Sequence, residues 1–307
     1  MVTPGAVLAP ETGSPAEPEW TGQSQWRLVW RRFKRHRLAL IGLGLLLVLT
    51  RVSVFAPVLT HYGPDQINLL NSDLPPSPQH LLGTDDLGRD ILTRLLYGGR
   101  ISLLIGFFTM IVASVIGTLY GLVSGYFGGY VDILMMRFVE LLLSFPAIFL
   151  LLILISYIGG HAPLVLMVLY LGLFGWMGLA RIIRGEVLRA RQMDYVDAAR
   201  SLGVSNARIV IRHILPNVMA PVWVSATFAA AGAMLSEAAL DYLGFGLPPG
   251  VASWGNMLAS ANATVLTQPL GAVVPGAMIT LAVVALNFVG DALRDALDPR
   301  HTETQGR

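Results

Sequence analysis

Cysteine is absent from the 307 residues, and lysine occurs only as Lys34. Without cysteine the chain has no disulfide, no thiolate nucleophile and no cysteine-based zinc site. A P-loop that binds ATP phosphates requires a lysine directly after a glycine, whereas Lys34 follows Phe33. The chain therefore does not hydrolyse ATP in the P-loop manner, and any energy from ATP must come from a partner.

Charged residues are also scarce. They make up 13% of the chain against 54% hydrophobic residues, and the mean hydropathy is +0.63. A soluble domain carries about 25% charged residues because its surface is hydrated, so most of this surface is expected to face membrane lipid. The basic residues lie beside apolar stretches rather than in one patch, so the pI near 9.0 does not predict a nucleic-acid partner.

Long apolar windows define the predicted architecture. A transmembrane helix needs about 20 mostly apolar residues, and about six windows meet this requirement. We place them at residues 38–59, 101–124, 139–158, 163–180, 218–235 and 270–290. The predicted fold class is therefore all-α, a polytopic membrane protein with about six transmembrane helices.

These windows also predict a division of the chain. Residues 1–25, rich in Pro, Gly, Ala and Glu, are expected to be a disordered cytoplasmic tail. Residues 26–99 should hold the first transmembrane helix and an extracytoplasmic loop. Residues 100–300 should form a core of five transmembrane helices with a cytoplasmic loop at 181–216, and residues 301–307 a second tail. Most arginines fall on the side that holds both termini, and cytoplasmic loops accumulate basic residues, so both termini are expected to be cytoplasmic.

A few polar residues and prolines fall within or near the predicted spans. Arg51 is expected to reach the outer interface, or to lie in a span that ends earlier than residue 59; a pair with Glu140 is the alternative. Glu140 and Glu237 lie near span ends, where a carboxylate stays hydrated or paired, and a contact with the solute is the alternative. Pro146 and Pro221 are expected to bend their helices.

Neither a metal site nor an enzyme active site is predicted. The six histidines are scattered and form no His-x3-His pair. The segment 83–90 lacks the alternating acidic residues of a calcium loop; Asp90 is instead expected to cap a helix that starts at Ile91 and to pair with Arg94. A Ser124–His161 dyad would be separated by about 30 Å of bilayer. We therefore expect no catalytic residue.

The longest hydrophilic stretch on the predicted inner side is 181–216, and it contains a short predicted helix at 195–203. Ala198 and Ala199 are small enough for another backbone to approach, and Gly203 is a natural helix stop. The pattern alone leaves two interpretations open: a docking element for a partner, or an amphipathic connector at the membrane surface.

The sequence Asp197-Ala198-Ala199-x3-Gly203, followed by Ile214-Leu215-Pro216, resembles the EAA loop of ABC importer permeases. Asp197 stands where that family usually has Glu, and His213 where it has Ile; the shorter Asp keeps the charge. Further stretches are similar to the dipeptide/oligopeptide/nickel permease group, at 80–90, 97–103, 125–132, 136–137, 144–146, 242–246, 254–258 and 291–300.

This resemblance implies a type I ABC importer permease (MetI-like) fold and the second, C-type, permease subunit. The coupling helix and loop that dock on the ATPase would then comprise Tyr195, Asp197, Ala198, Ala199, Gly203, Leu215 and Pro216. The implied partners are a homologous second permease in a heterodimer, two cytoplasmic ABC ATPases that carry ATP and Mg, and an extracytoplasmic substrate-binding protein. The outer residues expected to face that protein are Asp85, Asp86, Arg89 and Trp254.

The implied function is ATP-driven import of peptides across a bacterial or archaeal inner membrane, with no cofactor held by this chain. Nickel complexes or oligosaccharides remain open as alternative solutes. A secondary transporter that works without ATP is the rival class, for which inverted repeats or a mid-membrane ionisable relay are expected; the sequence has neither. It also identifies no substrate-binding residue.

Overall fold

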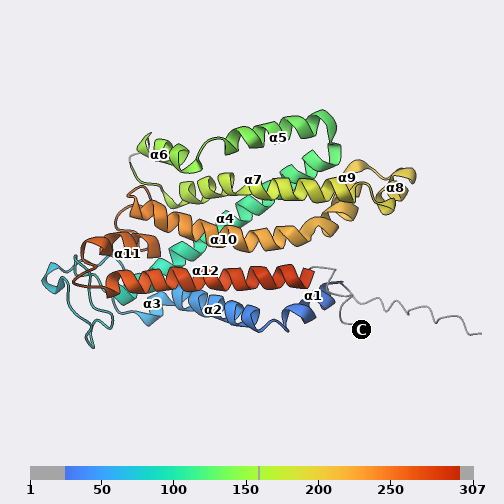
Figure 1. Ribbon diagram of the computed structural model, residues 1–307. Coiled ribbons are helices and arrows are strands. Elements are labelled where there is room, and N and C mark those ends of the chain that lie inside the picture. The colour runs from blue at the N-terminus through green and yellow to red at the C-terminus, as the bar shows by residue number, and fades with distance from the viewer. Residues whose placement is uncertain (1–24, 158–159, 298–307) are drawn as a thin grey trace, which may run out of the picture.

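The computed structural model describes residues 25–157 and 160–297, and helices provide most of its regular structure (Figure 1). The predicted disordered tail, 1–25, and the predicted tail 301–307 lie outside these ranges except for Gln25. An isolated antiparallel bridge joins Thr84 to Asp90. The all-α prediction is confirmed within the described residues.

The longer helices are α1 (Gln25–Phe33), α2 (Arg37–Val54), α4 (Ile91–Phe127), α5 (Gly129–Leu143), α6 (Ala147–Tyr157), α7 (Leu164–Ala190), α8 (Asp194–Ser201), α10 (Met219–Tyr242) and α12 (Leu270–Leu297). The shorter elements are α3 (Ala56–Leu59), η1 (Leu69–Asn71), α9 (Asn206–Arg208), η2 (Ile209–Ile214), η3 (Leu215–Val218), α11 (Trp254–Ser260) and η4 (Ala261–Ala263).

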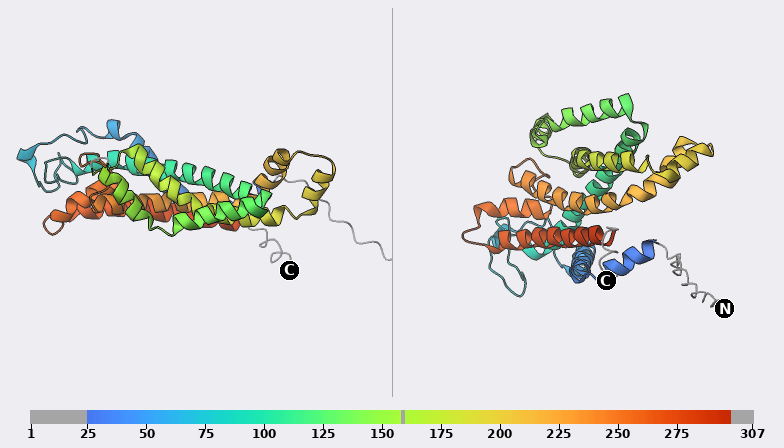
Figure 2. Two further views of the ribbon diagram at one scale, coloured as in Figure 1. Left: turned by 90° about the horizontal axis from the view of Figure 1, so that it is seen from above. Right: turned by 45° about the vertical axis from the view of Figure 1, so that its right-hand side comes forward.

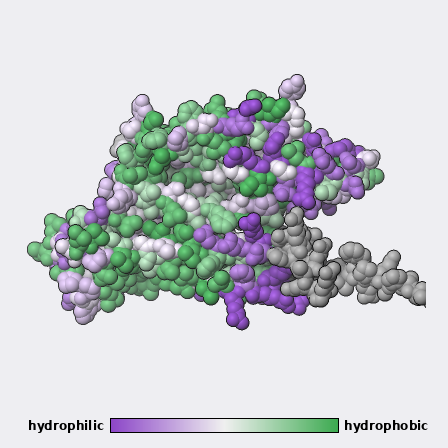
Figure 3. Space-filling model, viewed as in Figure 1, coloured by the Kyte–Doolittle hydropathy of each residue, from purple (hydrophilic) through white to green (hydrophobic). Residues whose placement is uncertain are grey.

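Five helices in the described chain are long and apolar enough to cross a membrane, or up to six if the bent pair α5–α6 forms one span. The five are α2, α4, α7, the helical stretch Asn206–Tyr242 and α12. In Figure 1, α2, α7, α10 and α12 run along the length of the molecule, with α4 crossing behind them. Hydrophobic side chains cover the middle of the molecule, and hydrophilic ones gather over the end that carries α1 and α8 (Figure 3). The chain is a multi-pass membrane protein, as its sequence predicts.

The helix that holds the second span starts before the apolar window predicted for it. α4 begins at Ile91, the start that the Asp90 cap predicts, whereas the window begins at residue 101, so the boundary set between residues 99 and 100 falls inside a helix. The hydropathy pattern misses the first turns because they contain Arg94 and Arg100. Arg94 is buried, yet its Nη1 donates to the Pro64 carbonyl at 3.1 Å and lies 3.7 Å from an oxygen of Asp65. These partners stabilise a charge that a hydropathy average treats as unpaired.

The third predicted span, 139–158, is two helices in the structure. α5 and α6 meet at an angle of 72° at the break before Ala147. Pro146 lies in this break, where its missing N–H and its ring are incompatible with a continuous helix. The predicted bend at Pro146 is confirmed, and the helical pair that contains the predicted span begins at Gly129.

The structure also adds detail to the predictions for the loop 181–216 and for Pro221. α7 continues through residue 190, so the first part of the predicted cytoplasmic loop 181–216 is helical. Pro221 lies in the first turn of α10, where proline is tolerated. The stretch Asn206–Tyr242 is one candidate span, so Pro221 does not break it.

Small residues bring the long helices close together. On α4, Gly117, Gly121 and Gly125 recur every fourth residue and face the backbone of α7. A Cβ added at Gly121 would lie 2.7 Å from the Ala180 carbonyl oxygen. Small residues at this spacing allow close backbone packing between helices in lipid, where apolar burial provides little driving force. This glycine seam fixes α4 against α7.

Candidate functional site

The short helix α8 lies beyond the end of α7, and the chain returns through α9 into the bundle. Figure 2 shows this yellow segment extending past the ends of the long helices, at the opposite end from the loop between α3 and α4. The predicted helix at 195–203 is therefore present, with bounds Asp194–Ser201. Its position makes it a candidate contact for a partner protein.

The two faces of α8 differ sharply. Val196 and Ala199 point inward, with exposed fractions of 0% and 6%, into a core that includes Val187 and Ile209. Tyr195, Asp197, Ala198, Arg200 and Leu202 are exposed, Leu202 at 83%. The predicted pair of small docking residues is thus divided: Ala198 faces outward and Ala199 packs within the chain.

Gly203 ends the helix as predicted. Its φ is +74°, in the left-handed region that favours glycine. Its N–H donates to the Arg200 carbonyl at 3.0 Å, and the Val204 N–H donates to the Ala199 carbonyl at 3.1 Å. The backbone conformation rather than crowding requires glycine here, since an added Cβ would meet nothing within 4 Å.

Asp197 carries the acidic charge of the motif. An Nη1 of Arg200 donates to Asp197 Oδ1 at 2.9 Å, and both side chains are more than half exposed. Exposed ion pairs of this kind contribute about 0–1 kcal/mol, so a partner can displace the contact at small cost. Asp197 is therefore available for docking.

The segment that leads from α8 back to α10 contains α9, η2 and η3, and we call it the return limb. It brings the other predicted residues close to α8. Leu215 is half-buried against the same core, and Pro216 is exposed in η3. The Asn217 amide lies 3.5 Å from the Tyr195 hydroxyl and donates to the His213 carbonyl at 2.6 Å. The structure thus joins the two separate parts of the motif.

The π-helical turn of η2 (Ile209–Ile214) precedes η3. Such turns occur frequently at functional sites. Neither hydrophobic periodicity nor the motif predicts this feature, because a π turn needs no special residue type.

The sequence analysis also missed a partly buried ion pair near the loop, between the buried Asp132 and the partly exposed Arg184. Arg184 of α7 donates from Nη2 to Asp132 Oδ2 of α5 at 2.6 Å, and its Nε binds Asp132 Oδ1. Ser124 of α4 donates to the same carboxylate. The signal was present, since Asp132 lies in the stretch 125–132 that carries the family resemblance, but that stretch names no partner for it. The contact connects α4, α5 and α7 near α8.

The residues predicted for the outer surface do not form one surface. Arg89 and Trp254 are buried at 6% and 1% exposure. Arg89 Nε binds Asp85 Oδ2 at 2.7 Å, and the Trp254 indole donates to the Leu95 carbonyl at 2.9 Å. We therefore correct the prediction for these two side chains, which stabilise the fold. Asp86 is exposed and Asp85 is half-buried.

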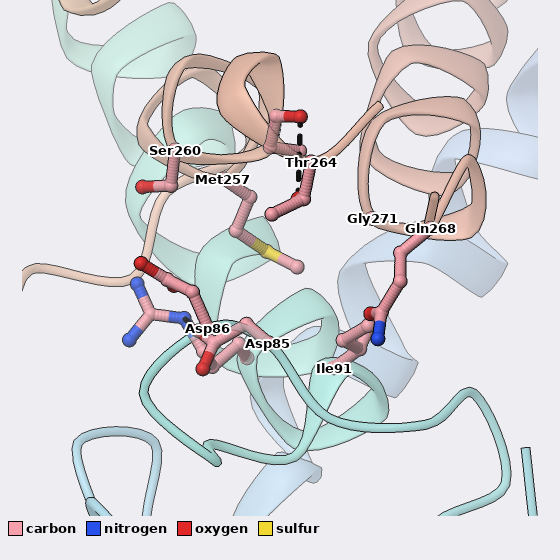
Figure 4. A pocket seen from close by; sticks show the side chains of 10 residues that line it. Asp85, Asp86, Ile91, Met257, Ser260, Thr264, Gln268 and Gly271 are labelled. Carbon is pink, nitrogen blue, oxygen red and sulfur yellow. Dashed lines mark hydrogen bonds and ion pairs between the residues drawn. The ribbon is translucent and has the colours of Figure 1, made fainter. Parts of the chain in front are cut away.

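Asp85 and Asp86 border a small cavity between this loop, α11 and the start of α12 (Figure 4). Met257 and Gln268 lie across it. Its volume of about 20 Å³ is close to the minimum for one water molecule. It is too small to hold a transported solute.

The predicted cap at the start of α4 is confirmed, but the predicted pairing of the cap residue is wrong. Asp90 Oδ2 accepts from the Thr93 N–H at 2.8 Å. Asp90 Oδ1 lies 3.0 Å from His80 Nδ1, whereas Arg94 lies near Asp65 and Asp85. Long-range loop folding supplied partners that sequence spacing does not indicate.

Arg51 and Glu140 do not form the pair that the sequence left open. Glu140 binds Arg137 at 2.9 Å on an exposed face of α5. Arg51 is exposed in the last turn of α2. α2 ends at Val54, so the first long helix ends before residue 59, where the predicted span ended.

Glu237 is fully buried rather than hydrated at a helix end. Ser102 donates to its Oε2 at 3.3 Å, and the Trp254 N–H donates to the Ser102 hydroxyl at 3.1 Å. One turn further on, Asp241 accepts from the Ser253 hydroxyl at 2.9 Å and from the Leu247 N–H at 2.7 Å. This network attaches α11 and its preceding loop to α4 and α10.

A larger hollow lies between α4, α6, α7 and α10, with a volume of about 360 Å³. Small residues of α10 form one wall, including Gly232, Ala233 and Ser236. Tyr170 and Phe174 of α7 lie on another side and stack with ring centroids 4.5 Å apart. Its lining is mostly apolar, and no sequence motif marked it.

The sequence matches two described families. The family "Binding-protein-dependent transport system inner membrane component" matches residues 117–303, and "N-terminal TM domain of oligopeptide transport permease C" matches residues 24–76. The dipeptide transport system permease protein DppC of Alkalihalophilus pseudofirmus is 37% identical over 298 residues, 96% of each chain.

Two oligopeptide transport system permease proteins OppC are similarly related. The protein of Bacillus subtilis is 37% identical over 277 residues, covering 90% of each chain. The protein of Haemophilus influenzae is 37% identical over 289 residues, covering 92% of this chain and 91% of the relative. The similarity therefore extends over nearly the whole length of each protein.

Proposed function

Because the chain belongs to the family of binding-protein-dependent transport system inner membrane components, we propose that it is the second, C-type, permease subunit of an ATP-driven peptide importer. It forms half of the translocation path and pairs with a homologous permease subunit. Two cytoplasmic ABC ATPases carry ATP and Mg, and this chain holds no cofactor. Both of its termini lie in the cytoplasm.

The observation that carries this proposal is the exposed face of α8. Tyr195, Asp197 and Ala198 project from the end of the molecule, while Val196 and Ala199 anchor the helix in the core. A short helix is suited to enter a cleft in another protein when its outer face carries a small residue and an available carboxylate and its inner face is buried in the core. Gly203, Leu215 and Pro216 set the shape of the loop that carries it.

The packing of α8 suggests how a movement of the ATPases is transmitted to the transmembrane helices. Its buried face shares one hydrophobic core with the ends of α4, α7 and the return limb. When the ATPase pair closes on ATP, a rigid-body displacement of α8 therefore moves these helices together. The path alternates between inward-open and outward-open packings of the spans.

The hollow of about 360 Å³ is our candidate for this chain's share of the path. The small residues of α10 leave space for a solute along the middle of that helix, and the homologous permease would close the open side of the hollow. At the opposite end of the molecule, exposed Asp86 offers a contact for the substrate-binding protein. Arg89 and Trp254 hold that surface in place from beneath.

Peptides are the favoured solutes because the full-length relatives at 37% identity are named as dipeptide and oligopeptide permeases. Nickel complexes and oligosaccharides are the alternatives. Thermal shifts of the associated binding protein with a dipeptide, a pentapeptide, a nickel complex and an oligosaccharide distinguish them. Stabilisation by the nickel complex or the oligosaccharide alone contradicts the peptide assignment.

Docking is tested by Ala198→Arg in the complete complex. A long charged side chain on the exposed face should prevent entry into the ATPase cleft, so co-purification of the ATPase subunits and uptake should both be lost. Gln66→Arg is the matched control, because Gln66 is exposed at the opposite end of the molecule. Both variants should insert in the membrane at the level of the unmodified chain. ATPase recovery unchanged by Ala198→Arg contradicts the proposal.

A further inference from the structure

Tyr126 lies near the end of α4, close to the base of α8, and only 6% of it is exposed. Its hydroxyl donates to Asn206 Oδ1 at 2.7 Å. Asn206 begins α9, so it is the first helical residue after the α8 turn. The bond connects positions 80 residues apart and ties α4 to the return limb.

The backbone of Tyr126 is tied to the other limb. Arg191, which caps the end of α7, donates from Nη1 to the Tyr126 carbonyl at 2.8 Å. Gly128 turns the chain between α4 and α5, and a Cβ there would lie 2.8 Å from the same nitrogen. Tyr126 therefore binds both the segment that enters α8 and the segment that leaves it.

Packing reinforces these two hydrogen bonds. Tyr126 shares its hydrophobic core with Val196 and Ala199 of α8 and with Ile209 of the return limb. The chain itself connects α8 only to α7 and to α10. A link from α8 to α4 must therefore be non-covalent. Tyr126 contributes a hydrogen bond to Asn206 of α9 and, together with Leu122 of α4, apolar surface in the shared core.

A link to α4 matters because this helix connects the α8 end of the molecule to the opposite end. It has 37 residues and reaches the opposite end of the molecule, where Ser102 accepts a hydrogen bond from the Trp254 N–H and donates one to Glu237. Movement of α4 therefore acts on the segment around α11 as well as on the wall of the hollow that contains Thr109.

We propose that Tyr126 is a positioning residue that holds α8 to α4 through Asn206, so that displacement of α8 by the ATPases moves α4 together with α7. This inference rests on the proposed function. If it holds, loss of the hydroxyl weakens the link between ATP hydrolysis and transport without removing the docking face.

The first test compares Tyr126→Phe with Tyr120→Phe in the complete transporter, reconstituted in vesicles with its binding protein. The Tyr120 hydroxyl is a matched control because it donates to the Met135 carbonyl at 2.9 Å, on the same helix but without contact to α9. The readout is the uptake of the probe trialanine per ATP hydrolysed. Tyr126→Phe should lower this ratio about two- to tenfold, the range that one hydrogen bond represents, and Tyr120→Phe should leave it unchanged.

Asn206 supplies the reciprocal test. Asn206→Asp keeps an oxygen acceptor and should retain the ratio, whereas Asn206→Leu should lower it as Tyr126→Phe does. The double variant Tyr126→Phe/Asn206→Leu should fall no further, because both changes remove one interaction. Additive losses contradict a shared contact.

A second readout needs no solute. Because the chain lacks cysteine, spin labels can be attached at Val115→Cys on α4 and Val273→Cys on α12, both exposed positions. ATP with vanadate should change the distance between the labels, and Tyr126→Phe should reduce that change while Tyr120→Phe preserves it. Equal behaviour of the two Phe variants in both readouts overturns the inference. Failure of the unmodified chain to recover ATPases overturns instead the proposed function beneath it.

Discussion

At the residue scale, Gly203 has the most restrictive backbone requirement in the docking loop, with φ at +74°. Gly203→Ala should strain the turn by about 1 kcal/mol and reduce ATPase recovery in co-purification. Gly203→Asn should have a smaller effect, because Asn enters the left-handed region more readily. Since space is open around this position, an equal loss for both variants would point to the side chain rather than to φ.

Arg184 offers a second residue-scale prediction. Its two-point contact with Asp132 requires the planar fork of a guanidinium. Arg184→Lys should therefore reduce the free energy of unfolding of the detergent-purified chain by about 1–3 kcal/mol. The measurement is the midpoint of thermal unfolding, which should fall. Arg137→Lys is the control, because the Arg137–Glu140 pair is exposed and should contribute little. Indistinguishable midpoints for the two variants contradict a stabilising role for the Arg184–Asp132 pair.

The individual side chains also show what the sequence can predict. The cap at Asp90 and the stop at Gly203 depend on neighbouring residues, and the structure confirms both. The partners of Arg94 and Glu237 come from loops distant in the chain, so spacing assigned Arg94 wrongly and missed the burial of Glu237. Local chemistry was predictable, but tertiary pairing was not.

At the element scale, the glycine seam between α4 and α7 gives the third prediction. Gly121→Ala places a Cβ 2.7 Å from the Ala180 carbonyl oxygen, so it should destabilise the bundle by about 1–3 kcal/mol. Gly178→Ala on α7 is the control, since a Cβ there meets nothing within 4 Å. The midpoint of thermal unfolding in detergent distinguishes them. An unchanged midpoint for Gly121→Ala would show that the seam tolerates separation.

The helices themselves were largely predictable, because long apolar windows identify transmembrane segments without knowledge of packing. The errors lie at the ends. α4 and α7 extend beyond their windows with arginines that hydropathy rejects, and these arginines find partners in the folded chain. The π turn at Ile209–Ile214 has no compositional signal.

At the scale of the whole molecule, α8 and the loop between α3 and α4 lie at opposite ends (Figure 1). The motif at 197–203 correctly marked a helix that stands off the bundle. It did not reveal that Ala199 faces inward, nor that Tyr126 of α4 supports the loop from below. The family resemblance identified the loop, and only the folded structure divides its residues into an exposed face and a buried one.

The central claim is that α8 lies in the cytoplasm and is covered by an ATPase. It is tested most directly by labelling single cysteines with a membrane-impermeant maleimide. Leu202→Cys follows α8 and Leu70→Cys lies in the loop at the opposite end; the native residues are 83% and 94% exposed. Leu70→Cys should react in right-side-out vesicles. Leu202→Cys should react only in inside-out vesicles stripped of ATPase, and adding the ATPase subunits should protect it. Reaction of Leu202→Cys in right-side-out vesicles, or an unchanged rate after ATPase addition, would contradict the account.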